Sequence, residues 1–130
     1  IEACLVGSEM CIRDREITDD LKNALVAKSN IFVMPSVKYK SSVEGFGIAY
    51  IEAAQYGVPS LGGADGGAAD AIQHDKTGLI CDGNNLDEIY SSLNSMIENK
   101  KYLHFGKNAK ELSSKFDWSN TIEQYKKILT

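Results

Sequence analysis

The stretch VEGFGIAYIEAAQYGVPSLGGADGG, residues 43–67, decides the fold. It predicts a glycine turn at Gly45 to Gly47, a helix from about Gly47 to Tyr56 and a buried strand over VPSLG. Gly57 is expected to end the helix, because glycine adopts the left-handed conformation without a steric penalty. A turn, a helix and a strand in so short a run are typical of the alternation that builds a parallel sheet.

The alternation continues on both sides of this stretch. Before it, TDDLKNALVAKS predicts an amphipathic helix capped by Thr18, and NIFVMPS predicts a buried strand that Pro35 stops. After it, we expect a short helix around residues 69–73 and a strand over GLICD. LDEIYSSLNSMIENK and residues 107–115 and 121–129 predict three further helices. The fold class expected is therefore α/β, with a parallel sheet and helices on both faces.

Composition excludes several classes of protein. The chain has 130 residues, 43% of them hydrophobic and 25% charged, as in one ordinary globular domain. A net charge of -4 and a pI near 5.1 argue against a nucleic-acid partner. The sequence has neither an apolar run long enough for a membrane span nor a signal-peptide pattern. We expect a cytoplasmic protein.

The N-terminal segment is set apart from the rest of the chain. LVGSEMCIRD, residues 5–14, resembles the translation of a transposase adapter used in sequencing libraries. We therefore treat residues 1–15 as a non-native segment and residues 16–130 as the domain. Cys4 and Cys11 then say nothing about redox compartment. Cys81, which has no Cys or His at ligand spacing, is expected to be a small buried hydrophobe.

Glu44 and Glu52 lie eight positions apart, on either side of the predicted glycine turn and helix start. Such a helix start attracts phosphate, because its first amides have no partner within the helix and glycine lets a diphosphate approach closely. Glu52 lies about 7 Å further along the helix axis. Carboxylates suit the adjacent hydroxyls of a sugar ring but repel phosphate. The pattern predicts a ligand with a hydroxyl-bearing ring on each side of a diphosphate, that is, a nucleotide sugar.

These residues resemble a known family. EGFGIAYIE is similar to the E-x7-E motif of family 4 (group 1) retaining glycosyltransferases. Four further stretches resemble segments of the family in the same order: SNIFVMPS, YGVPSLGGADGGAADAI, KTGLICDGNNLDEI and FDWSNTIEQYKKIL. The resemblance implies a Rossmann-like sheet, as a partial C-terminal domain of the two-domain GT-B fold. It also implies transfer of a hexose from a nucleotide-diphosphate sugar to a glycan or lipid acceptor.

The resemblance also implies a role for each residue of the motif. Glu44 would be the catalytic residue that orients the transferred sugar, and Glu52 would bind the ribose. The diphosphate and the wall of the donor site would be contacted by Gly45, Phe46, Gly47, Ile48, Gly66 and Gly67. Asp70, with Ala69 before it, leans toward GDP-mannose without excluding a UDP-sugar. No metal or other cofactor is implied.

Part of the family pattern has no counterpart here. The Arg and Lys that neutralise the diphosphate, and the N-terminal domain that binds the acceptor, are missing, so we expect the 130 residues alone to be inactive. The full-length enzyme is expected to associate peripherally with a membrane. A non-catalytic nucleotide-sugar-binding module remains the alternative. A dinucleotide-dependent oxidoreductase is disfavoured because GFGIAY lacks a third glycine.

Other candidate residues have simpler interpretations. His74 and His104 have no partners at metal or triad spacing and are expected at the surface. DGNNLDE, from Asp82, predicts a turn and a helix start rather than a calcium loop. Trp118 and Tyr125 are expected to pack in the core or between domains.

Overall fold

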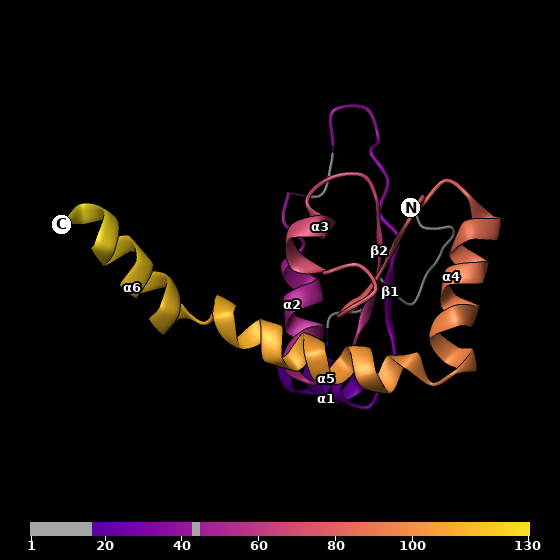
Figure 1. The fold of residues 1–130 in the computed structure, drawn as a ribbon, viewed down its shortest axis with the longest axis horizontal. Helices are drawn as coiled ribbons and strands as arrows, with labels where there is room; N and C mark the ends of the chain where they lie inside the picture. Colours follow the sequence, from indigo (N-terminus) through magenta and orange to yellow (C-terminus); the bar gives the residue numbers. More distant parts are fainter. Residues whose placement is uncertain (1–16, 43–44) are drawn as a thin grey trace.

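The computed structural model describes residues 17–42 and 45–130, which form one three-stranded parallel sheet between layers of helices (Figure 1). The strands are β1 (Phe32–Met34), β2 (Ser60–Gly63) and β3 (Gly78–Cys81), in the order β1, β2, β3. The predicted α/β class and parallel sheet are confirmed. The adapter-like segment, residues 1–15, lies outside the described residues.

The two faces of the sheet follow the alternation of side chains along each strand. Phe32 and Met34 of β1 pack on one face, whereas Leu61 of β2 and Leu79 of β3 pack on the other. All four residues of β2 are buried because it is the central strand and both of its faces are covered. The apolar runs of β2 and β3 are thus largely buried parallel strands, as predicted. The run of β1 is a parallel strand at the edge of the sheet with Val33 44% exposed, so its predicted burial is wrong.

Helices α2 (Ile48–Gln55) and α3 (Ala68–Ala71) cover the first face, and α4 (Leu86–Glu98) covers the second (Figure 1). Helix α5 (Lys101–Ser113) crosses the end of the sheet and packs against both α2 and α4. The first core cluster contains Tyr50, Ile51, Ala68, Ala71 and Ile72. The second contains Leu61, Leu79, Cys81, Met96 and Phe105.

The predicted N-cap at Thr18 and the predicted helix end at Gly57 are confirmed. Thr18 begins α1 (Asp19–Ala27), and its hydroxyl accepts a hydrogen bond from the Leu21 amide at 3.2 Å. Asn85 caps α4 by accepting from the Glu88 amide, so the segment from Asp82 is a turn and a helix start, as expected. Gly57, with φ 73°, follows the end of α2 in the left-handed conformation expected for it.

Three predicted helix boundaries were wrong. Helix α5 begins at Lys101 rather than near residue 107, because Gly106 does not interrupt it. Gly106 lies against the Gly57 carbonyl, in a space that no side chain could occupy, and this packing offsets its poor helix propensity. Helix α6 (Trp118–Leu129) begins three residues earlier than predicted, with Asp117 as its N-cap, after the 3-10 helix η2 (Ser114–Phe116). Helix α3 ends at Ala71, two residues short of the predicted end.

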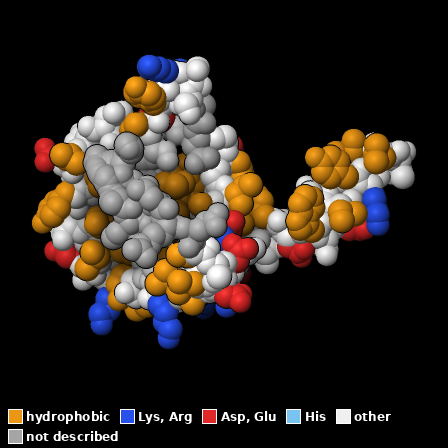
Figure 2. All heavy atoms as spheres, turned by 180° about the vertical axis from the view of Figure 1, so that it is seen from behind, with side chains coloured by type: hydrophobic (Ala, Val, Ile, Leu, Met, Phe, Trp, Pro, Cys, Tyr) orange, Lys and Arg blue, Asp and Glu red, His pale blue; other side chains and the backbone are white. Residues whose placement is uncertain are grey.

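Helix α6 projects from the rest of the structure, and none of its residues is buried (Figure 1). Hydrophobic side chains gather along it (Figure 2). Trp118 is 78% exposed and Tyr125 is 64% exposed, so they do not pack in the core, and their packing between domains stays a prediction. In the part of the chain that the structure describes, no helix combines the length and the apolar character that crossing a membrane requires.

Gly67 provides a test of the contact between the turns after β1 and β2. A Cβ at residue 67 would overlap the Gly45 carbonyl oxygen, although the φ of -90° at Gly67 is open to any residue. We therefore expect Gly67→Ala to lower the free energy of unfolding by about 1–3 kcal/mol. Ala69→Ser adds one atom at an exposed position nearby and should change it by less than about 0.5 kcal/mol. Urea unfolding measures both, and an equal effect would contradict the contact.

Cys81 provides a test of the second core cluster. Burial raises the pKa of its thiol, and the carboxylates of Glu88 and Asp82 add to the rise. The unfolded chain therefore loses the thiol proton at a lower pH than the folded chain, and stability should fall as pH rises through the unfolded pKa of about 8.5. We expect this fall to be smaller in Cys81→Ala, as measured by urea unfolding at several pH values. Mass spectrometry of the Cys81 peptide should show alkylation only after unfolding.

Candidate functional site

The loops that follow the three strands meet at one edge of the sheet, because parallel strands end at the same edge. The Lys38 amide, in the loop after β1, donates a hydrogen bond of 2.8 Å to Asp65 Oδ2 in the loop after β2. The Ala64 amide donates to the Cys81 carbonyl at the end of β3, also at 2.8 Å. These bonds join all three loops into one surface.

Helix α2 begins at this edge with an N-terminus that no side chain caps. Its N-cap, Gly47, has a φ of 82° and lies against the ring of Tyr50, so a side chain would both strain the backbone and strike the ring. The peptide groups at the start of a helix have amides without partners inside the helix. The predicted residues Gly45, Gly47 and Ile48 thus lie at a helix start suited to an anion.

The second glycine turn lies directly against the first. Gly66 has a φ of 86°, and the backbone of Gly67 touches the Gly45 carbonyl. Two predicted groups of site residues, separated by a helix and a strand in the sequence, are therefore neighbours in space. Helix α3, which follows Gly67, has four residues.

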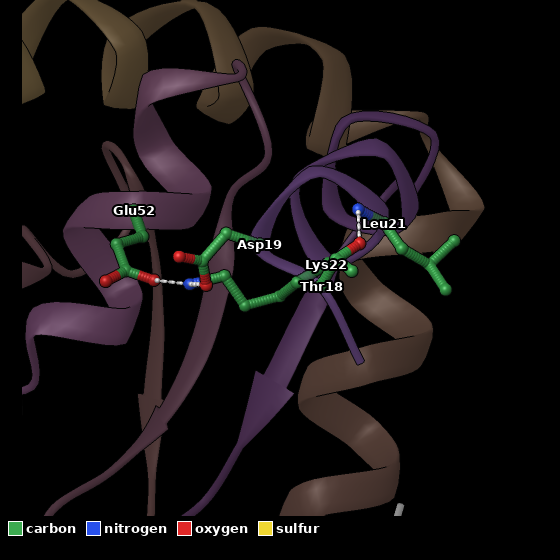
Figure 3. Close-up of polar contacts among 5 residues, drawn as sticks. All are labelled: Thr18, Asp19, Leu21, Lys22 and Glu52. Carbon is green, nitrogen blue, oxygen red and sulfur yellow. Dashed lines mark hydrogen bonds and ion pairs between the residues drawn. The ribbon is translucent and has the colours of Figure 1, made fainter. Parts of the chain in front are cut away.

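Glu52 lies on the exposed side of α2, where 48% of its side chain is accessible. Its Oε1 lies 3.3 Å from the ammonium of Lys22 on α1, and Lys22 lies 4.0 Å from Asp19 as well (Figure 3). Glu44, the other predicted glutamate, lies outside the described residues. The structure therefore places one of the two carboxylates and gives it a partner.

Phe46 turns its side chain inward. The ring is half buried and lies 5.5 Å from the ring of Phe116, measured between centroids. Its backbone stays at the glycine turn, which is the part of Phe46 that the prediction concerns. A groove of about 650 Å³ opens beside Glu52 and is lined by Phe46, Ile48, Ile51, Glu52, Gln55, Phe116, Asp117 and Trp118.

Sequence reasoning missed three residues that shape this edge. Tyr50 is buried and its hydroxyl donates to the Met34 carbonyl at 2.6 Å, which ties α2 to the end of β1. Asp65 accepts from the amide of Lys38, 27 positions away, and Lys22 contacts Glu52, 30 positions away. No local pattern marks such pairs. A tyrosine on a buried helix face, in contrast, signals a hydroxyl that needs a partner.

A metal site would require several ligand side chains close together. Over residues 17–42 and 45–130, no three His, Cys, Asp or Glu side chains are grouped as a metal would require. His74 is exposed, and its Nδ1 accepts a hydrogen bond of 2.9 Å from the Ile80 amide, so it serves the local turn. The absence of a cofactor stays a prediction.

Most of the chain, residues 12–112, matches the family described as glycosyl transferases group 1. The chain belongs to this family. The matched range begins within the adapter-like segment and ends in α5, so α6 lies beyond it.

Among curated relatives of this group 1 glycosyltransferase, one from Mycobacterium tuberculosis is 34% identical over 96 residues. It is a GDP-mannose-dependent alpha-(1-6)-phosphatidylinositol monomannoside mannosyltransferase. The alignment covers 72% of this chain and 25% of the relative. The chain thus spans about a quarter of the length of that mannosyltransferase.

Solved structures support the fold. Anabaena HepE, in complex with UDP, has a TM-score of 0.70 at 23% identity, over 81% of this chain and 28% of HepE. The sucrose-phosphate synthase of Thermosynechococcus elongatus has a TM-score of 0.73 at 22% identity, over 88% of this chain and 28% of that structure. The expected GT-B relationship, with this chain matching part of the larger fold, is confirmed.

The Tyr50 hydroxyl offers a test of how the site edge is held. In Tyr50→Phe the Met34 carbonyl keeps its bond from the Ser36 amide at 2.8 Å, so no buried carbonyl is left without a partner. We expect a loss of about 0.5–1.5 kcal/mol in the free energy of unfolding, the usual value of one hydrogen bond. Tyr90→Phe, at a tyrosine that is 72% exposed on α4, should have no effect. Equal losses in the two variants would contradict the role of the bond.

Proposed function

We propose that this chain is the donor-binding part of a retaining glycosyltransferase that transfers a hexose from a nucleotide-diphosphate sugar to a glycan or lipid acceptor. The observation that carries the proposal is the uncapped start of α2 at the carboxyl edge of a parallel sheet, with Glu52 exposed on the same helix. Similar proteins support the proposal: the mycobacterial relative is described as GDP-mannose-dependent, and the HepE structure contains UDP. The donor is GDP-mannose or a UDP-sugar.

The diphosphate is bound by the first turn of α2 and the two glycine turns. The backbone amides from Gly45 to Ile48 approach it, and Gly66 and Gly67 form the opposite wall. Amides are suited to this task in an acidic chain, because they bring partial positive charge without a cationic side chain. They are fixed before the reaction, so they stabilise the negative charge that develops on the leaving phosphate.

The reaction itself needs no covalent nucleophile in this proposal. The bond between the anomeric carbon and the donor phosphate oxygen breaks, and the acceptor oxygen bonds to that carbon on the same face of the sugar. The acceptor proton passes to the departing diphosphate. Glu44 holds the hydroxyls of the transferred sugar near the reacting geometry, so its contribution comes from orientation. No metal takes part.

Glu52 binds the hydroxyls of the ribose. A carboxylate accepts several hydrogen bonds and matches two adjacent hydroxyls, whereas it would repel the diphosphate. Its half-exposed position on α2 leaves it open to a ligand at the sheet edge. The ribose does not change during transfer, so Glu52 contributes equally to donor binding and to the transition state.

The alternative is a nucleotide-sugar-binding module without catalysis. It differs from the enzyme in one measurable respect, which is turnover by the full-length protein. In both cases we expect the 130 residues to bind nucleoside diphosphate but not to transfer sugar, since acceptor binding belongs to the N-terminal domain of such enzymes. A cytoplasmic enzyme that associates peripherally with a membrane completes the proposal.

The two glutamates test the roles. Glu52→Ala should weaken binding of free nucleoside diphosphate about 10- to 150-fold, the value of hydrogen bonds to a charged acceptor. Glu44→Gln should leave that binding intact and lower kcat of the full-length enzyme, because orientation contributes mainly in the transition state. Calorimetry measures the first effect, and steady-state kinetics with donor titration measures the second.

Glu123→Ala is the matched control for Glu52→Ala. Glu123 is an exposed glutamate on α6 whose carboxylate also lies 3.3 Å from a lysine ammonium. It should change neither binding nor turnover. Loss of nucleotide binding in Glu44→Gln but not in Glu52→Ala would reverse the two roles. No effect in either would rule out the site.

A further inference from the structure

The contact between Lys22 and Glu52 joins two helices that are distant in the chain (Figure 3). Lys22 lies on α1, and its side chain extends to the Glu52 carboxylate on α2, 3.3 Å from Oε1. The pairs Lys22 with Asp19 and Lys126 with Glu123 instead join neighbours three residues apart on one helix. The Lys22 ammonium is thus placed at Glu52 by the tertiary fold.

Stability does not account for this contact. The side chains of Lys22 and Glu52 are 44% and 48% exposed, and solvent screens an ion pair at that exposure. Such pairs contribute little to the free energy of unfolding, because ordering two long side chains offsets the weak attraction. The contact instead restricts the orientations that the Glu52 carboxylate can adopt.

We propose that Lys22 is a positioning residue, which holds the Glu52 carboxylate in the orientation that binds the ribose hydroxyls of the donor. The inference rests on the proposed role of Glu52. Lys22 bonds Oε1, which leaves Oε2 and the remaining lone pairs to accept from the ligand. A carboxylate held in this way loses less conformational entropy when the ribose binds.

A second acidic residue helps to place the Lys22 ammonium. Asp19 Oδ1, 4.0 Å from the ammonium, lies on α1 one turn before Lys22 and favours the side-chain position that reaches Glu52. Lys22 therefore supports recognition of the ribose without contacting the donor.

A direct contact between Lys22 and the phosphates is the competing explanation, and 2′-deoxy ligands separate the two. Calorimetry with UDP, GDP and their 2′-deoxy counterparts gives the ratio of ribose to deoxyribose affinity in the 130-residue chain. If Lys22 acts through Glu52, Lys22→Met should weaken the ribonucleotide about two- to five-fold, the range of exposed ion pairs, and leave the deoxyribonucleotide nearly unchanged. Lys22→Arg should keep the affinity ratio of the unaltered chain, because it retains the positive charge.

Two controls isolate the pair. Lys126→Met removes the lysine of the equally close pair on α6 and should change neither affinity. Lys22→Met in the Glu52→Ala background should have no further effect, because the residue through which it acts is gone. The melting temperature should be the same in all single variants, so a change in the ratio cannot reflect a damaged fold.

The outcomes distinguish this inference from the function on which it rests. Equal weakening of ribo- and deoxyribonucleotides by Lys22→Met, or no weakening at all, would overturn the positioning role while leaving Glu52 in place. An unchanged ratio in Glu52→Ala would overturn the ribose role of Glu52 and the inference with it. Failure of the unaltered chain to bind either nucleoside diphosphate would overturn the proposed function itself.

Discussion

The contact between the backbones of Gly67 and Gly45 is the constraint on which the site edge depends. It brings the turn after β1 and the turn after β2 to a distance that leaves no room for a side chain. The hydrogen bonds from Lys38 to Asp65 and from Ala64 to Cys81 reinforce the same approach, so the loops of all three strands share one surface. A helix start placed in this surface has its amides fixed by the sheet beneath it.

The opposite end of the sheet is closed by side chains and backbone packing instead. Helix α5 crosses there, touches α2 through the close approach of Gly106 to Gly57, and sends Phe105 into the second core cluster. The Tyr50 hydroxyl anchors α2 to β1 near the loop end. Helix α2 is thus held at both ends, which keeps its exposed face, with Glu52, in a constant place relative to the glycine turns.

The proposed function divides recognition of the donor between backbone and side chains. The chain is acidic overall, and a net charge of -4 would not by itself attract a diphosphate. In the proposed function the helix amides meet the phosphates, and carboxylates meet hydroxyls. Lys22 fits this division as a partner for a carboxylate rather than for a phosphate.

The sequence determined what depends on local physics. Alternating apolar runs, Thr18 at a helix start and Gly57 at a helix end fixed the strands, the caps and the α/β class, because these depend on periodicity and on backbone preferences within a few residues. The motif from Glu44 to Glu52 led to the group 1 glycosyltransferases, and the comparison confirmed membership of that group. Local signals failed at Gly106, where a residue unfavourable in a helix is retained because a distant backbone packs against it.

The tertiary structure decided which distant residues meet. Nothing near Gly67 in the sequence indicates that it touches Gly45, and nothing near Lys22 indicates that its ammonium reaches Glu52. The sequence also could not tell that Trp118 and Tyr125 lie on a projecting helix rather than in the core. Such facts follow from the positions of whole helices and strands, which are set by the packing of two core layers rather than by any pattern along the chain.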